Sequence, residues 1–129
     1  MTSAHGKHVY IDYIGYYRNE IHTGEWMLSI MEKAVELAGV RHVHSHVVEF
    51  DGSLSPTGFA AVILLDESHV SAHCYYEQGW LALDAFTCGG GDPNVIADYI
   101  DEALQSEMPK ITQMRRDCVK RFLHEDIKK

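Results

Sequence analysis

The chain has 129 residues, enough for a single domain with one hydrophobic core. Its net charge of −8 argues against a nucleic-acid partner, because phosphate binding needs concentrated Lys and Arg. No apolar run approaches the ~20 residues of a membrane-spanning helix, and residues 1–8 lack the apolar core of a signal peptide. We therefore expect one cytoplasmic domain over residues 1–129 with no membrane contact.

The first half of the chain reads as strand, helix and strand. Residues 8–14 are rich in β-branched and aromatic side chains, which is typical of a strand. Apolar residues recur at helical spacing over residues 23–38, and Gly39 suits the left-handed position that ends many helices. A weaker strand pattern covers residues 40–50, and turn-forming residues at 51–57 predict a loop.

The second half begins with the most apolar run, residues 58–65, which predicts a central strand or one buried on both faces. We expect a short strand at 71–75 and an alternating strand at 79–86. Asp92-Pro93 is a good helix start, and residues 111–122 fit a last strand or a short helix. This order predicts an α/β (α+β) two-layer sandwich, with two helices on one face of a mostly antiparallel sheet.

Cysteine thiolates and histidine imidazoles are common metal ligands, and this chain contains both. The cysteines are Cys74, Cys88 and Cys118. They form no C-x-x-C pair, so we expect free thiols rather than a zinc framework. The alternating histidines are His42, His44 and His46. A regular strand would place all three on one face, but an exposed polar strand explains them without a metal, and we predict no metal site.

Polar side chains with useful chemistry follow the apolar run. If the strands on either side of this turn pair, Ser68, His73 and Cys88 can converge at one end of the sheet. A serine close to histidines could indicate a hydrolase. No G-x-S-x-G elbow surrounds Ser68, however, so a hydrolase is disfavoured.

Two stretches together resemble a known family. Residues 67–73 (E-S-H-V-S-A-H) are followed by Glu77 and by residues 82–89 (A-L-D-A-F-T-C-G). This closely resembles the short bacterial and archaeal S-adenosylmethionine decarboxylases, whose pattern is E-S-H-[LV]-[ST]-x-H-T-W-P-E, then a glycine, a strand and D-x-F-T-C-G. Residues 6–9 also resemble the family opening, G-x-H-L. The resemblance implies a carboxy-lyase that feeds spermidine synthesis, an α/β sandwich fold, and a homodimer with active sites near its interface.

The resemblance further implies a proenzyme that cuts itself between Glu67 and Ser68. The products would be a beta chain of residues 1–67 and an alpha chain of residues 68–129. Ser68 would become an N-terminal pyruvoyl group, which forms a Schiff base with the substrate amine. Its carbonyl would accept the electron pair left by loss of carbon dioxide.

Three further positions match family residues with known roles. His73 matches the residue implicated in self-processing. Cys88 matches the acid that reprotonates the product, and a thiol can serve as a general acid. Glu77 matches the carboxylate that binds the ribose hydroxyls of S-adenosylmethionine.

The chain also departs from the family pattern at three places. Ala60 stands where the family has a serine that assists self-processing, and a methyl group cannot donate a hydrogen bond, although Thr57 could. T-W-P is replaced by residues 74–76 (C-Y-Y). Leu54 stands where an aromatic residue is thought to stack on adenine, and Phe50 could compensate only through an insertion.

These departures leave two alternatives open. One is a pyruvoyl-dependent decarboxylase of ornithine or arginine on the same scaffold, in which Glu77 would hold a cationic side chain. The other is an uncleaved, non-enzymatic family member that binds ligand or a partner subunit, a reading that Ala60 favours.

Overall fold

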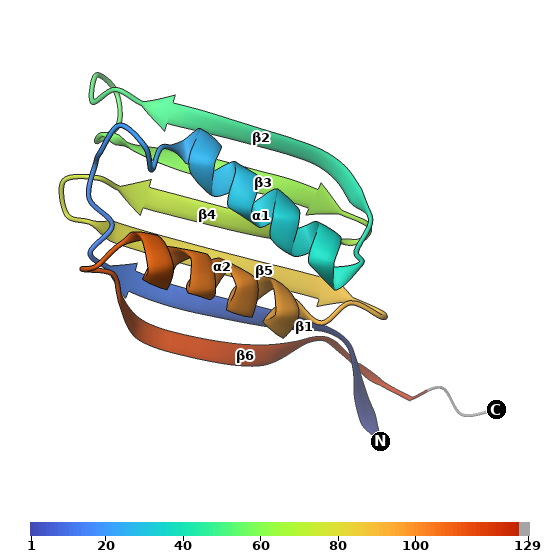
Figure 1. Cartoon of the computed structure of the whole chain (residues 1–129). Helices are drawn as coiled ribbons and strands as arrows, with labels where there is room; N and C mark the ends of the chain where they lie inside the picture. Colours follow the sequence, from blue (N-terminus) through green and yellow to red (C-terminus); the bar gives the residue numbers. More distant parts are fainter. Residues whose placement is uncertain (127–129) are drawn as a thin grey trace.

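The structure is a computed structural model that describes residues 1–126, and it consists of one sheet with two helices on one face (Figure 1). The elements in chain order are β1 (Thr2–Ile14), α1 (Gly24–Ala38), β2 (His42–Phe50), β3 (Gly58–Leu65), β4 (Ser68–Tyr75), β5 (Trp80–Cys88), α2 (Pro93–Glu107) and β6 (Thr112–Glu125). Neither helix within this part of the chain is long and apolar enough to cross a membrane. The predicted two-layer α+β sandwich is confirmed.

The six strands have the order β2-β3-β4-β5-β1-β6, and every neighbouring pair is antiparallel. The first strand therefore lies between two strands from the second half of the chain. Its register places Gly6 opposite Cys88 on β5. A Cβ at Gly6 would lie 3.1 Å from Cys88 Sγ and 3.0 Å from the Thr87 carbonyl oxygen, so this close approach requires glycine.

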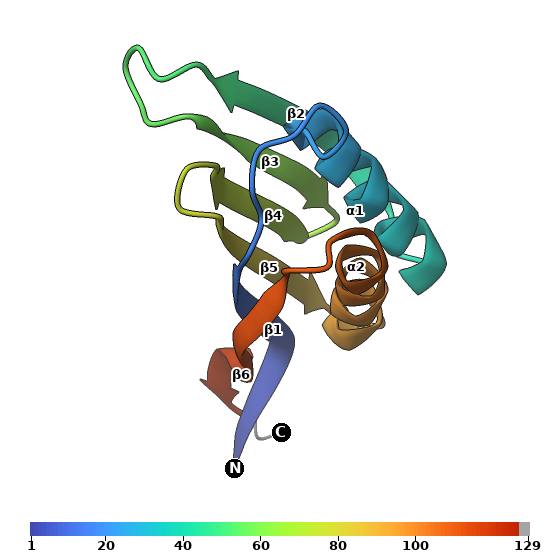
Figure 2. The same ribbon diagram turned by 60° about the vertical axis from the view of Figure 1, so that its left-hand side comes forward.

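Local signals begin and end both helices. The Thr23 side chain accepts a hydrogen bond from the Trp26 amide at the start of α1, and Gly39 ends it with a φ of 71°. The Asp92 side chain accepts from the Asn94 amide at the start of α2. Figure 2 shows that both helices pack on the same side of the sheet. The fully buried helix residues that fill this core include Met27, Met31, Ala34, Ile96, Ile100 and Leu104.

The opposite face of the sheet carries no helix (Figure 2). Along β3 the inward residues Ala61 and Ile63 are buried, whereas Leu64 on the uncovered face is 47% exposed. The expectation that this strand is buried on both faces is therefore wrong for the single chain. β3 does have a strand on each side, but it lies next to the edge strand β2 rather than at the centre.

Strand lengths and one side-chain pattern differ from the sequence-based expectations. β4 begins at Ser68 rather than at residue 71, and residues 112–125 form a strand because they pair with β1 along their length. The three histidines of β2 do not share a face, because a bulge lies between His42 and His44. His42 contacts Ser45, which bonds to Glu32 of α1, while His44 pairs with exposed Leu64 on the other face.

Candidate functional site

The β3–β4 hairpin has a two-residue turn, Asp66-Glu67, closed by the pair of Leu65 and Ser68. Ser68 is thus the first residue of β4. Its side chain is buried, and Ser68 Oγ has no hydrogen-bond partner among the described residues. Glu67 has a φ of +60°, in the left-handed region that residues with a Cβ rarely adopt. An unbonded hydroxyl therefore lies directly after a residue with unusual backbone geometry.

The antiparallel register of β4 and β5 brings Cys88 to this turn. His69 pairs with Phe86, so the end of β5 runs back along the start of β4. Cys88 Sγ lies 3.4 Å from the carbonyl oxygen of Glu67 and donates to it. The Cys88 thiol therefore contacts the carbonyl of the bond that precedes Ser68. We call this group of Glu67, Ser68 and Cys88 the serine end.

The three cysteines are free thiols in different environments. Cys74 is buried against the helices, and burial raises its pKa to about 12, so it stays protonated. Cys118 is exposed on β6, whereas Cys88 is half-buried at the serine end. Among the three thiols, only Cys88 combines a position beside Ser68 with partial access to solvent.

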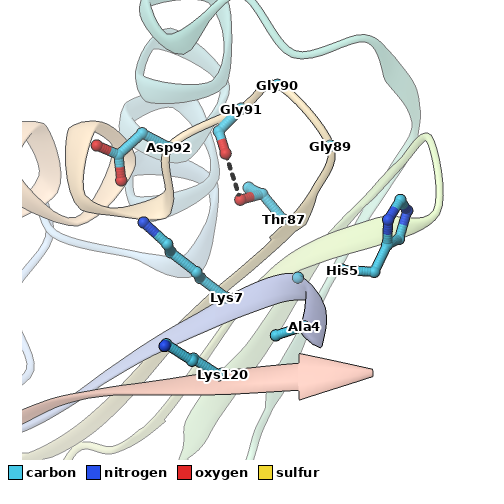
Figure 3. A pocket seen from close by; sticks show the side chains of 10 residues that line it. Ala4, His5, Lys7, Thr87, Gly89, Gly90, Gly91, Asp92 and Lys120 are labelled. Carbon is cyan, nitrogen blue, oxygen red and sulfur yellow. Dashed lines mark hydrogen bonds between the residues drawn. The ribbon is translucent and has the colours of Figure 1, made fainter. Parts of the chain in front are cut away.

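A cavity of about 410 Å³ lies beside Thr87 and Gly89, the chain neighbours of Cys88, and its volume is within the size range of small-molecule sites. It lies between β1, β6 and the glycine-rich loop that connects β5 to α2. Figure 3 shows Lys7 and Lys120 side by side beneath this loop. The Thr87 hydroxyl donates to the Gly91 carbonyl at 2.8 Å and so holds the loop over the cavity. Two ammonium groups and the Asp92 carboxylate therefore line this hollow.

His73 lies elsewhere. It is five residues after Ser68 on β4, which corresponds to about 16 Å along a strand. An odd separation also places the two side chains on opposite faces, with His73 exposed on the uncovered face. The predicted convergence of His73 with Ser68 and Cys88 is thus wrong within one chain. Ala60 is the residue directly opposite His73 on β3, so the missing serine hydroxyl would have faced this imidazole.

The remaining expected site residues lie near His73, at the opposite end of the sheet from Ser68 (Figure 1). Glu77 is exposed in the turn between β4 and β5, and Leu54 is 99% exposed in the loop between β2 and β3. Phe50, at the end of β2, lines a hollow of about 300 Å³ together with His73. We call the group of Ala60, His73, Glu77, Leu54 and Phe50 the histidine end.

Sequence reasoning missed a charged network on the uncovered face. His8 Nε2 lies 2.9 Å from Asp84 Oδ1, and Arg121 Nη1 lies 3.3 Å from His8 Nδ1. Because arginine can only donate, Nδ1 accepts and the proton resides on Nε2. Burial, together with His8, lowers the pKa of neighbouring His69. His8 and Asp84 both lie in the motifs noted above, but nothing in the sequence indicated that they pair.

Comparisons with known proteins identify the family of this chain. Residues 7–117 match the family model described as S-adenosylmethionine decarboxylase. Over 106 residues the chain is 35% identical to the S-adenosylmethionine decarboxylase proenzyme of Brevibacillus brevis and 36% identical to that of Persephonella marina, covering 81% of this chain and 77% of each relative. The crystal structure of the adenosylmethionine decarboxylase from Aquifex aeolicus matches with a TM-score of 0.69 and 28% identity, over 95% of this chain and 91% of that one.

Proposed function

Because this chain belongs to the S-adenosylmethionine decarboxylase family, we propose that it decarboxylates S-adenosylmethionine after cutting itself between Glu67 and Ser68. The family is pyruvoyl-dependent and generates its pyruvoyl group from a serine by self-cleavage. The observation that carries the proposal is the free, buried Ser68 hydroxyl next to the carbonyl that Cys88 contacts. Cleavage there would separate residues 1–67 from residues 68–129.

The serine end fits the chemistry that forms such a group. Ser68 Oγ attacks the Glu67 carbonyl carbon, the C–N bond breaks, and the hydroxyl proton moves to the Ser68 nitrogen. Loss of the Ser68 α-proton then expels the Glu67 carboxylate, and water replaces the nitrogen, which leaves as ammonia. Within residues 1–126 no competing hydrogen bond holds the attacking hydroxyl, and the Cys88 thiol donates to the oxygen that becomes negative.

Once formed, the pyruvoyl group supplies an electron sink for decarboxylation of an amine-bearing substrate. The chain itself must then supply the proton that replaces carbon dioxide on the substrate. Cys88 is the half-buried thiol at the serine end, and we propose it as this general acid. Buried Cys74 cannot replace it, because it lies six residues further along β4 and burial raises its pKa to about 12.

We further propose that the active unit is a homodimer whose uncovered sheet faces pack together. Within one chain, Ser68 and His73 lie on opposite faces and at opposite ends of β4. A two-fold axis across the uncovered face would bring the histidine end of one copy to the serine end of the other. That packing would also cover exposed apolar side chains of this face, which include Val48, Leu64, Tyr75, Trp80 and Phe122.

The proposed substrate contacts come from the histidine end. Glu77 is exposed and free to accept hydrogen bonds from two ribose hydroxyls. Leu54 offers apolar area but no ring, whereas Phe50 lies beside His73 and supplies an aromatic face nearby. The relatives named above are S-adenosylmethionine decarboxylase proenzymes, so neither ornithine or arginine as substrate nor a non-enzymatic role is favoured. The cytoplasmic location stays a prediction.

Denaturing mass spectrometry of the purified protein tests the cleavage. We expect fragments of residues 1–67 and 68–129, the second with a blocked N-terminus, since the serine nitrogen is lost. Carbon dioxide release from S-adenosylmethionine, ornithine and arginine, measured side by side, tests the substrate; we expect release from S-adenosylmethionine alone. A full-length species that persists through long incubation would refute the proposed function.

A further inference from the structure

The backbone of Glu67 has a conformation that residues with a Cβ rarely adopt. Among the described residues, positive φ angles occur at five glycines and at only two other residues, Glu67 and Phe122. The neighbouring β4–β5 turn has a similar φ of +71°, but it places Gly79 there. A Cβ in the left-handed region contacts the following carbonyl, which glycine avoids. The turn before Ser68 thus carries a strain that the next turn does not.

The hairpin does not offset this strain by a favourable turn type. Two-residue hairpin loops that match the twist of a sheet have a positive φ at their first position. Here the first position is Asp66, which is not among the positive-φ residues, while the second position, Glu67, is. The turn is therefore neither type I′ nor type II′, the two types that two-residue hairpin loops favour.

Side-chain contacts do not compensate either. The Glu67 side chain is 75% exposed, and the ion pair found for it joins it to His5 at 3.8 Å. An exposed ion pair of this length contributes little to stability. The backbone oxygen of Glu67 has one specific contact, the Cys88 thiol, which polarises the carbonyl rather than relaxing the φ angle.

We propose that the left-handed conformation of Glu67 drives the N-to-O acyl shift at Ser68, so that Glu67 is a positioning residue for self-cleavage. In the amide, a single atom, the Ser68 nitrogen, joins the Glu67 carbonyl carbon to the Ser68 Cα. In the ester, Ser68 Oγ and Cβ join them, so the link is one atom longer and the tight turn can relax. The shift is an isomerisation that needs no co-reactant. This inference rests on the proposed function.

The rate of self-cleavage after cell-free synthesis tests the inference. Glu67→Gly tolerates a positive φ without strain, and we expect it to slow cleavage about tenfold. Gln78→Gly adds a glycine to the neighbouring β4–β5 turn instead, so it is the control and should cleave within about twofold of wild type. Cleavage of Glu67→Gly at the wild-type rate would overturn the inference while leaving the proposed function intact. A wild-type chain that never cleaves would instead refute the proposed function.

Thermal unfolding separates released strain from added flexibility. In a Ser68→Ala background, which cannot cleave, Glu67→Gly should raise the Tm by about 4 °C, because the folded turn loses its strain. Glu67→Gln should leave the Tm unchanged. An equal or lower Tm for Glu67→Gly would show that the turn stores no strain, and this result would overturn the inference even if cleavage became slower.

Discussion

The serine end and the histidine end lie at opposite ends of the sheet and differ in their distance from the bond between Glu67 and Ser68. At the serine end, the Cys88 thiol of β5 contacts the Glu67 carbonyl, directly before Ser68, within a single chain. At the histidine end, His73 faces the methyl group of Ala60, far from the bond it is expected to help cleave. The bond before Ser68 thus belongs to the β3–β4 hairpin of one chain, whereas His73 could reach it only in the proposed dimer.

We expect the largest effect from mixed dimers, which test whether His73 of one chain assists cleavage at Ser68 of the other. Ser68→Ala and His73→Ala chains should each stay intact when expressed alone, because one lacks the nucleophile and the other its assisting imidazole. Co-expressed, they form dimers in which one site has both residues intact and the other has neither. We therefore expect cleavage of the His73→Ala chain only in the mixture, measured by mass spectrometry of residues 68–129.

Ser71→Ala, which removes a hydroxyl from the same strand, is the matched control for Ser68→Ala and should process normally. If co-expression yields no cleaved chain although mixed dimers are isolated, the two ends do not act across a dimer interface. If His73→Ala alone is cleaved normally, His73 has no part in processing.

Restoring a hydroxyl at the histidine end should increase the rate of self-cleavage. Ala60→Ser places a hydrogen-bond donor directly across β3 and β4 from His73. One donor to a developing oxyanion typically changes a rate by about 10²–10³-fold, so we expect cleavage to accelerate by at least about tenfold. The measurement is the cleavage time course after cell-free synthesis.

Val62→Thr serves as the control. It adds a hydroxyl to the same face of β3, two residues from Ala60 and opposite Ser71. It should leave the rate unchanged. Equal rates for Ala60→Ser and wild type would mean that another group, such as Thr57, already replaces the missing serine.

The smallest expected effect concerns His69 at the serine end. Burial holds its folded pKa below the usual 6.5, so the folded state disfavours the charged form. The stability it contributes is present above pH 6.5 and is lost as pH falls through the lower folded pKa, because the unfolded chain binds the proton first. The charges that face it are His8, Asp84 and Arg121.

In the uncleavable Ser68→Ala background, urea midpoints between pH 7.5 and pH 5 measure this effect. The urea midpoint should fall less between pH 7.5 and pH 5 in His69→Gln than in the His69 parent. At pH 7.5 the midpoints of the two proteins should differ by less than this change. An identical fall in both proteins would exclude His69 as a source of the pH dependence.

Much of the fold followed from local patterns in the sequence. The ends of α1 and the start of α2 depend on single side chains, Thr23, Gly39 and Asp92, acting on nearby backbone groups. Such short-range effects can be recognised without knowing the fold. The strand over residues 112–125 could not, because its side chains fit a helix equally well and only pairing with β1 selects the extended form.

The candidate site was recognised in part. Motif spacing predicted Ser68 and Cys88 as site residues, and the β4–β5 register brings the Cys88 thiol to the carbonyl before Ser68. The position of His73 was misjudged because β4 was expected to begin at residue 71, which left its relation to Ser68 undefined. With β4 extended back to Ser68, the odd separation alone places the two residues on opposite faces.

The amino-acid sequence by itself determined the family, the candidate serine and the helices, because these depend on residue identity and short-range spacing. Only the tertiary structure decided which end of the sheet each residue occupies, that both helices cover the same face of the sheet, and that His8 meets Asp84 and Arg121. Those residues are 76 and 113 positions apart in the chain. Contacts over such separations follow from the order and register of the strands, which no local pattern contains.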